Sequence, residues 1–253
     1  MNDLPSNDAG VRSLVKEIES AGGKATSFIA NVVNHSEVKD MVHHTVDVFG
    51  SLHVMVANAG ISKVKPILEQ TERDVREMMD VNFMGVFHCY TLAAKQMIRQ
   101  QQEEGVKLEP GGVNAGKIIG AASLAAFRPF QYLAHYAASK HAVRGFTQGL
   151  ALEIAKHNIT VNAYAPGIVD TPMWEESDRE MGRREGKKPR ETLEELAGSV
   201  ALGRLSTGDD VAKTVSFLAS THSDYMTGQV GVLEMFTPKI YPVVAVFVLK
   251  EGC

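Results

Sequence analysis

Short apolar segments alternate with helical patterns along most of the chain, and this alternation constrains the fold more than any other feature. Four of the segments are rich in small or β-branched residues, are bounded by turn residues and are typical of strands. They lie at 25–32, 52–60, 117–123 and 159–167. Alternation of this kind is typical of a parallel sheet covered by helices on both faces. The sequence therefore predicts an α/β fold in a single domain over 1–253.

Capping signals predict where two of the helices begin and end. Ser36 is expected to cap a helix that closes at Gly50. Thr71 is expected to open a longer helix that runs through Arg99. The polar segment 174–196 then interrupts the alternation of strand and helix. A long polar excursion in a compact domain is often a mobile lid over a substrate, and we interpret this segment as one.

Charge and cysteine content exclude several classes of protein. The net charge is −4 and the pI is about 6.1, so no basic field is available to bind nucleic acid or an anionic membrane. The longest apolar run, at 241–249, is too short to cross a bilayer, and the amino terminus lacks the pattern of a signal peptide. Cys89 and Cys253 cannot form a disulfide framework. We expect a cytoplasmic protein without a metal site.

The stretch "HYAASKHAV" places Tyr136 and Lys140 four residues apart, on one face of a helix. Two interpretations are open. The pair is either a solvated face with a lysine whose stem covers apolar surface, or an ammonium that stabilises a phenolate and lowers the tyrosine pKa from about 10. In the second case Tyr136 is a proton donor or acceptor near neutral pH.

Small-residue turns, "ANAG", "AAS" and "APG", follow three of the predicted strands. Parallel sheets bind ligands at the carboxyl ends of their strands, so these turns mark the expected site. Ser123 ends the strand before the Tyr136 helix, and we expect its hydroxyl to reach a substrate oxygen. Asn82 lies in an otherwise apolar helix, where it either satisfies backbone groups or anchors a water chain that feeds Lys140.

The combination of these motifs resembles the short-chain dehydrogenase/reductase family. The motifs are "NAG" at 58–60, Asn82, Ser123, "YAASK" at 136–140 and "PGIVDTPM" at 166–173. Their order and the thirteen-residue step from the serine to the tyrosine are those of the family. The resemblance implies a Rossmann-like, doubly wound parallel sheet and an NAD- or NADP-dependent oxidoreductase that interconverts a ketone and a secondary alcohol.

The resemblance also implies a catalytic tetrad. Tyr136 takes the position of the acid/base and Ser123 that of the substrate anchor. Lys140 takes the position of the ribose clamp, and Asn82 that of the residue that holds a water molecule.

A set of cofactor-binding residues follows from the same resemblance, in addition to Tyr136 and Lys140. Its members are Asp3, Asn31, Val32, Asn58, Ala59, Gly60, Pro166, Gly167, Ile168 and Thr171. Asp3 is expected to meet the ribose hydroxyls, and Asn31 stands where the family has an aspartate that meets adenine. Residues 58–60 are expected along the adenosine half, and the last four members around the nicotinamide.

Substrate and assembly are implied by finer resemblances. The segments "PGIVDTPMW", "LGRLS" and "SDYMTGQ" look most like those of acetoin/diacetyl reductases, that is, 2,3-butanediol dehydrogenases. Family members pack the helices that correspond to 71–99 and 135–156 against each other in dimers, so a homodimer or homotetramer is expected.

The chain departs from the family at both ends. Members begin with a strand and a glycine-rich turn, T-G-x-x-x-G-x-G, that binds the pyrophosphate at a helix amino terminus. No such turn occurs here, so we expect a fold truncated at its amino terminus. The tail 235–253 is also atypical of the family. Three interpretations of its apolar run at 241–249 are open: a strand that fills a vacancy in the sheet, an exposed edge strand, or translated non-coding sequence. The alternative function is therefore a non-catalytic homologue that acts as a binding or oligomerising module.

Overall fold

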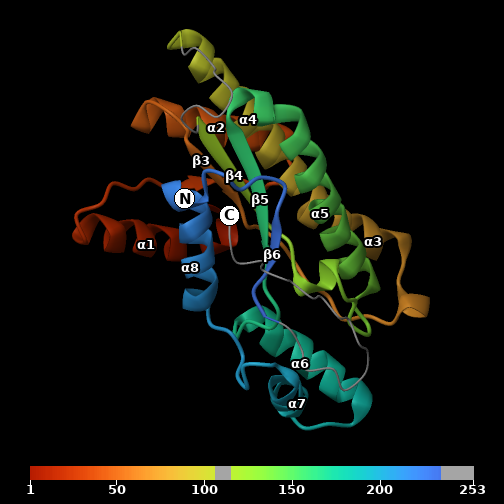
Figure 1. The fold of residues 1–253 in the computed structure, drawn as a ribbon. Helices are drawn as coiled ribbons and strands as arrows, with labels where there is room; N and C mark the ends of the chain where they lie inside the picture. The colour runs from red at the N-terminus through yellow and green to blue at the C-terminus, as the bar shows by residue number, and fades with distance from the viewer. Residues whose placement is uncertain (106–114, 235–253) are drawn as a thin grey trace, which may run out of the picture.

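The computed structural model describes residues 1–105 and 115–234 (Figure 1). The predicted tail at 235–253 lies outside the described residues. Within the described part, no helix is both long enough and apolar enough to span a membrane.

A four-stranded parallel sheet forms the centre of the molecule. Its strands are β3 (Val54–Ala57), β4 (Gly116–Ala121), β5 (Ile159–Ala165) and β6 (Val230–Val232), and they lie in that order. Every neighbouring pair is parallel. The predicted α/β class with a Rossmann-like parallel sheet is confirmed.

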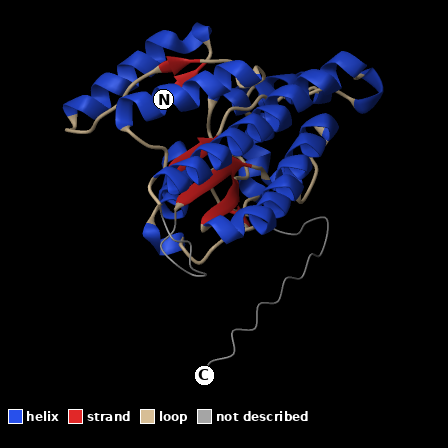
Figure 2. Ribbon diagram, turned by 90° about the horizontal axis from the view of Figure 1, so that it is seen from above, coloured by secondary structure: helices blue, strands red, loops and turns tan. Residues whose placement is uncertain are grey.

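A second, two-stranded sheet lies apart from the first (Figure 2). It pairs β1 (Asn2–Asp3) with β2 (Phe28–Ile29), again in parallel. The predicted strand at 25–32 therefore shortens to two residues. No strand of the described residues joins the two sheets, so β3 is an edge strand.

Helices cover the four-stranded sheet on both faces. One face packs against α2 (His35–Phe49), α4 (Gly85–Glu103) and α5 (Ala134–Ile154) in a single large apolar cluster. The opposite face carries a smaller cluster beneath α8 (Gly208–Ala219). The alternation of side chains along β4 and β5 divides their residues between the two clusters.

Four further helices and several 3-10 turns complete the described residues. They are α1 (Asp8–Ser20), α3 (Glu72–Met79), α6 (Pro172–Glu185) and α7 (Glu191–Ser199), with 3-10 turns at Pro5–Asn7, Ile67–Glu69, Leu124–Ala126, Ala155–His157 and Thr221–Ser223.

The end signals of α2 were predicted in part. Gly50 ends the helix in the left-handed region, with φ of 85°, as expected of a glycine after a helix. The amino-terminal prediction was wrong, because Asn34 rather than Ser36 is the cap. The Asn34 side chain accepts a hydrogen bond from the Ser36 N–H and also from its hydroxyl.

The long helix predicted from Thr71 to Arg99 begins as expected but is not continuous. Thr71 caps α3 in a reciprocal capping box with Asp74. A π turn at Asp80–Met84 then separates α3 from α4. Such a turn accommodates one extra residue and is frequent at functional sites.

The polar segment 174–196 is not an irregular excursion, since α6 and α7 occupy most of it. Pro172 stands in the first turn of α6, where its missing N–H costs nothing. The Asp178 carboxylate accepts hydrogen bonds from the N–H groups of Arg190 and Leu193, which fastens the start of α7 to α6. Polar composition reflects two exposed helices rather than a loop.

Candidate active site

The four predicted tetrad residues come from three elements that meet at the carboxyl end of the sheet. Ser123 follows β4, Asn82 lies in the π turn, and Tyr136 and Lys140 lie one turn apart on α5. The Lys140 Nζ lies 5.7 Å from the centre of the Tyr136 ring. All four are close enough to serve one site.

Ser123 and Tyr136 form the reactive face of this group. The Ser123 side chain caps a short turn by accepting the Ala125 N–H at 3.1 Å, which fixes its hydroxyl in place. Ser123 and Tyr136 line one small cavity. Two hydroxyls that face one cavity can both contact one carbonyl oxygen of a substrate.

The pKa of Tyr136 differs in direction from the expectation that Lys140 lowers it. Burial raises the pKa of Tyr136, and the hydrogen bond with Ser123 opposes this only in part. Lys140 has no such effect here, because its Nζ donates to the Ala121 carbonyl at 2.8 Å. Tyr136 is therefore a protonated phenol at neutral pH, which suits a proton donor.

Lys140 is a buried cation. Burial lowers the pKa of its ammonium to about 8. One hydrogen is used on Ala121, and an ammonium carries two more that can bind ribose hydroxyls. The interpretation of Lys140 as a solvated, snorkelling side chain is wrong, since only 4% of the residue is exposed.

Asn82 connects the π turn to the loop after β3. Its Oδ1 accepts the Ile61 N–H at 2.8 Å, and its Nδ2 donates to the Ile61 carbonyl and to the Ser139 hydroxyl. These contacts satisfy the side chain, which is completely buried. Of the two sequence-based interpretations, the structure favours the one in which the amide satisfies backbone groups.

Three further residues support the site, and sequence reasoning missed them. Ser139 bridges Asn82 and the Tyr136 carbonyl, and the only signal was its place inside "YAASK". The buried Tyr164 hydroxyl donates to the Asn58 side chain across the sheet. The Glu234 carboxylate accepts the Ile168 N–H at 2.9 Å.

The loop expected at adenine is held by two helices. Asn31 donates its N–H to Glu37 of α2 and accepts the Val33 N–H on its own side chain. The Val32 carbonyl accepts a hydrogen bond from His88 of α4 at 2.9 Å. These hydrogen bonds hold the loop in a fixed conformation. The Asn31 Nδ2 can still donate a hydrogen bond to a ring nitrogen of adenine.

Asp3 lies at the end of β1. Its carboxylate accepts hydrogen bonds from the Leu4 N–H and from the Asn7 side chain, both at 2.7 Å. The carboxylate retains further lone pairs, so a role at a ribose hydroxyl stays a prediction.

The loop expected at the nicotinamide is shaped by close packing. A Cβ on Gly167 would lie 2.2 Å from the Glu234 carboxylate, so only glycine fits there. Thr171 caps the start of α6 and donates its hydroxyl to the Val169 carbonyl. The segment from Pro166 to Ile168 therefore leads directly into α6.

A small cavity of about 20 Å³ lies between the tetrad and α6. Its lining residues are Ser62, Ser123, Phe130, Leu133, Tyr136, Gly167, Met173, Trp174 and Ser177. The Phe130 and Trp174 rings meet edge to face, 6.1 Å apart. This contact closes α6 over the two reactive hydroxyls.

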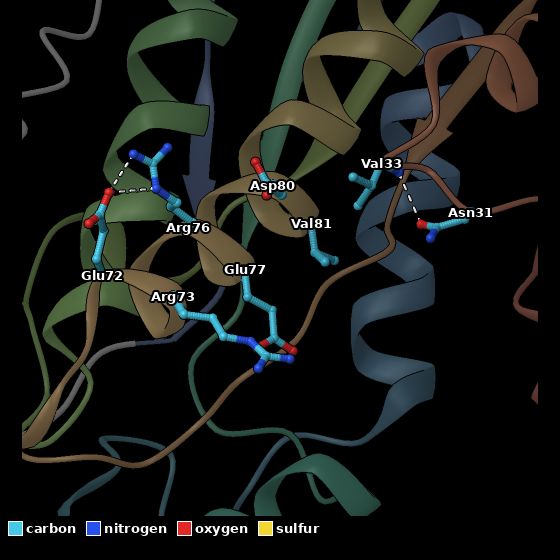
Figure 3. Close-up of a pocket in the computed structure, with 8 residues that line it drawn as sticks. All are labelled: Asn31, Val33, Glu72, Arg73, Arg76, Glu77, Asp80 and Val81. Atoms are coloured by element: carbon cyan, nitrogen blue, oxygen red, sulfur yellow. Dashed lines mark hydrogen bonds and ion pairs between the residues drawn. The ribbon is translucent and has the colours of Figure 1, made fainter.

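A larger, open pocket of about 650 Å³ lies away from the tetrad (Figure 3). It is lined by Asn31 and Val33 on one side and by α3 and the π turn on the other, including Val81. The remaining lining side chains are charged: Glu72, Arg73, Arg76, Glu77 and Asp80. The pocket borders the predicted adenine loop, but it contains no group of the tetrad.

Lys140→Met should leave the fold at least as stable at pH 7, and in a chain extended to bind the cofactor it should weaken cofactor binding and catalysis. The folded-state pKa of about 8 lies below the reference value of 10.5, so charge on Lys140 destabilises the fold at low pH. The destabilisation is full below pH 8 and decreases between pH 8 and 10.5, because the unfolded state binds more protons in this range. Above pH 10.5 the destabilisation is absent. Methionine removes the cost but loses a hydrogen bond of about 1 kcal/mol.

Thermal melting of both proteins between pH 6 and 11 measures this difference. The melting temperature of the variant relative to the wild type should fall as the pH rises through that window. A variant that keeps its activity and changes only in stability would show that Lys140 serves packing alone.

The fold and the site together define an oxidoreductase of the Rossmann type, and comparison with known proteins identifies the family. A sequence model described as short chain dehydrogenase matches residues 4–182. The chain is 41% identical to L-2,3-butanediol dehydrogenase of Corynebacterium glutamicum over 232 aligned residues. The alignment covers 92% of this chain and 85% of the relative. The chain is 38% identical to a diacetyl reductase [(S)-acetoin forming] of Staphylococcus epidermidis, over 88% of this chain and 82% of the relative.

Solved structures agree with this result. The structure of NAD⁺-bound xylitol dehydrogenase superposes with a TM-score of 0.82 at 26% identity, covering 92% of this chain and 86% of that one. Levodione reductase superposes with a TM-score of 0.80 at 27% identity, covering 92% and 84%. The chain belongs to the short-chain dehydrogenase family, whose members are NAD- or NADP-dependent oxidoreductases.

The described residues can bind the ribose next to Lys140 and the adenine of a dinucleotide, but they provide no site for its pyrophosphate. At the ribose next to Lys140, a Cβ on Gly60 would lie 3.5 Å from the Nζ, so glycine keeps this approach open. Asn31 can serve the adenine. For the pyrophosphate, the described residues contain no glycine-rich turn at a helix amino terminus. The first turns of α1 and α2 carry the acidic side chains of Asp8 and Glu37, which disfavour an anion.

Proposed function

We propose that this site reduces small vicinal diketones and hydroxyketones to secondary alcohols, and oxidises the alcohols in reverse, with NAD(H) or NADP(H). The observation that carries the proposal is that Ser123 and Tyr136 line the same small, aromatic-walled cavity. The names of the two relatives support the substrate class, since they act on butanediol and on diacetyl.

Each residue of the tetrad has a distinct task in this proposal. When bound, the nicotinamide supplies or accepts the hydride at the carbonyl carbon. Ser123 donates a hydrogen bond to the carbonyl oxygen and holds it, and Tyr136 protonates that oxygen as negative charge develops. Lys140 binds the ribose hydroxyls with the ammonium hydrogens that Ala121 does not accept. Asn82 fixes the loop at Ile61 beside them.

The size of the cavity supports small substrates. A volume of about 20 Å³ leaves room for no more than a water molecule while Trp174 rests on Phe130. A four-carbon diketone requires a modest movement of α6, whereas a steroid or a long acyl chain requires this helix to leave its position. Phe130 and Trp174 therefore favour compact substrates.

The experiment is a substrate panel on an extended chain. We define the extended chain as this protein with a strand, the turn T-G-x-x-x-G-x-G, a helix and a second strand joined before Asn2. We expect kcat/KM for diacetyl and acetoin to exceed that for a steroid ketone or a long 3-ketoacyl thioester by on the order of 100-fold. The reverse order of preference would show the proposed substrate class to be wrong.

Trp174→Ala provides the matched comparison. Removing the indole opens the cavity without touching Ser123 or Tyr136, so the preference for small ketones should narrow by on the order of tenfold. If the kcat/KM ratios between small and large ketones were the same in Trp174→Ala and in the parent chain, the Phe130–Trp174 contact would be excluded as the source of selectivity.

A second candidate function is a non-catalytic binding or oligomerising module. The observation in its favour is the lack of a pyrophosphate-binding turn among the described residues. We propose assembly into a homodimer or homotetramer through α4 and α5, where Leu152 is 84% exposed. Titration followed by nicotinamide fluorescence separates the two candidates, because only an enzyme must bind the dinucleotide.

A further inference from the structure

The small cavity beside the tetrad contains more hydroxyl groups than the binding of one carbonyl oxygen requires. Four hydroxyl-bearing side chains line it, those of Ser62, Ser123, Tyr136 and Ser177. The other lining residues are a glycine and apolar or aromatic side chains. Ser123 and Tyr136 are assigned to the reacting oxygen, so Ser62 and Ser177 have no task in the reaction as described above.

Ser62 offers the cavity a hydroxyl whose hydrogen is unused. The loop is fixed just before it, because the N–H and the carbonyl of Ile61 both bond the Asn82 side chain, at 2.8 and 2.9 Å. It is fixed again just after it, where the Lys65 N–H donates to the Tyr132 carbonyl at 2.9 Å. Within residues 1–105 and 115–234 the Ser62 hydroxyl has no hydrogen-bond partner. Its hydrogen is therefore free for a ligand.

Ser177 differs from Ser62, because its hydrogen is already used. The Ser177 Oγ donates to the Met173 carbonyl, one turn earlier in α6, at 3.0 Å. The oxygen keeps lone pairs that can accept a hydrogen bond. Only 5% of the residue is exposed, so these lone pairs are largely removed from bulk solvent. Towards the cavity, Ser177 is an acceptor.

The size of the cavity brings all four hydroxyls within reach of one small ligand. Its volume of about 20 Å³ corresponds to about one water molecule. Ser62 belongs to the loop after β3, whereas Ser177 belongs to α6. A ligand that bonds both therefore bridges the fixed loop and the helix that closes over the site.

An α-hydroxyketone carries the groups that match this arrangement. Its carbonyl oxygen accepts hydrogen bonds from Ser123 and Tyr136. Its hydroxyl both accepts and donates, so it satisfies the Ser62 donor and the Ser177 acceptor at once. The second oxygen of a diketone only accepts and leaves Ser177 without a donor. A simple ketone has no second oxygen and leaves both serines without a partner.

We propose that Ser62 and Ser177 bind the hydroxyl group next to the reacting carbonyl, and that they make the site selective for α-hydroxyketones. In the reverse direction the same two residues bind the second hydroxyl of a vicinal diol. The inference rests on the proposed function, because it takes the reacting oxygen to lie on Ser123 and Tyr136.

Trp174 gives a binding readout in the 253-residue chain as it stands. It is the only tryptophan of the chain and it lines the cavity, so its indole N–H gives a single NMR signal that reports on a ligand there. Titrations with acetoin and with 2-butanone compare two ligands that share a carbon skeleton and differ by the hydroxyl. We expect the dissociation constant of acetoin to be about tenfold lower, as hydrogen bonds to buried partners allow.

Serine-to-alanine variants assign this difference to the two residues. Ser62→Ala and Ser177→Ala should each remove most of it, since either substitution leaves the ligand hydroxyl without one partner. Ser51→Ala is the matched control, because Ser51 lies at the opposite end of β3 from Ser62 and does not line the cavity. The control should keep the wild-type difference. Equal dissociation constants for the two ligands, no binding of either, or a difference that both cavity variants keep would overturn the proposal.

Initial rates of the extended chain separate this inference from the proposed function. Ser177→Ala should lower kcat/KM for acetoin about tenfold more than for diacetyl, because only acetoin can donate to Ser177. Ser62→Ala should lower kcat/KM for both, because both can accept from Ser62. An equal effect of Ser177→Ala on the two substrates would overturn the inference and leave the reductase assignment intact. An extended chain that reduced no ketone would refute the proposed function, whereas a serine-dependent preference for acetoin in the titrations would still support the inference.

Discussion

Replacing Tyr136 by phenylalanine is expected to lower kcat for diacetyl reduction by the extended chain by on the order of 1,000-fold. Phenylalanine has nearly the same volume but cannot give a proton to the substrate oxygen. Tyr136 is partly buried and lines the same small cavity as Ser123. The measurement is the initial rate of NADH or NADPH oxidation with diacetyl.

Tyr132→Phe is the matched control. Tyr132 packs against the same apolar cluster as Tyr136, so its substitution tests any general effect of losing a hydroxyl there. The control should keep most of the wild-type rate, and both variants should keep the wild-type melting temperature within a few degrees. A Tyr136→Phe protein that retained most of its rate would refute the tetrad assignment.

Adding the glycine-rich unit before Asn2 is expected to convert a chain with little or no dinucleotide affinity into one that binds at micromolar concentration. The pyrophosphate requires several backbone N–H groups at a helix amino terminus. Neither α1 nor α2 provides a favourable site for them, because Asp8 and Glu37 already place negative charge in the first turns of these helices. Nicotinamide fluorescence measures the change.

A second extended chain, with alanine at each glycine of the added turn, is the control for this result. It adds the same strand and helix but prevents the close approach of the backbone to phosphate. If both versions bound equally, the added unit would act by stabilising the sheet rather than by holding the pyrophosphate.

The sequence predicted those features that depend on local chemistry. The start of α3 follows from Thr71, and the left-handed residue after α2 follows from a glycine at position 50. The cap of α2 lies at Asn34 rather than at the predicted Ser36, because both residue types are good caps and the sequence does not rank neighbours two positions apart. The structure brings the four residues of the predicted tetrad close together, and their catalytic roles stay a prediction.

Features that depend on burial or on distant partners were not predictable from the chain. The pKa of Tyr136 rises rather than falls, because burial outweighs the bond with Ser123 and Lys140 donates to Ala121 instead. The fit of Glu234 against Gly167 joins residues that are 67 positions apart, and no local pattern marks such a pair. The π turn at Asn82 was hidden within a continuous helical periodicity.

The separation of the strands into two sheets also depends on residues that are distant in the sequence. The strand character of 25–32 and of β3 was visible in the sequence, but pairing between strands is a non-local property. The segment at 174–196 contains α6 and α7, and the sequence-based interpretation of it as a lid stays a prediction. Its helices are stabilised by contacts such as the bond from Arg184 to Glu180, which a count of polar residues does not reveal.

The central claim is that this chain assembles the tetrad of the family but does not bind the cofactor pyrophosphate. Calorimetric titration of the 253-residue chain with NADH and with NADPH tests it most directly. We expect no saturable heat below about 1 mM for either dinucleotide, which corresponds to a binding free energy weaker than about −4 kcal/mol. Saturable binding at micromolar concentration by the unextended chain would contradict the claim and would show that its own residues rebuild the pyrophosphate site.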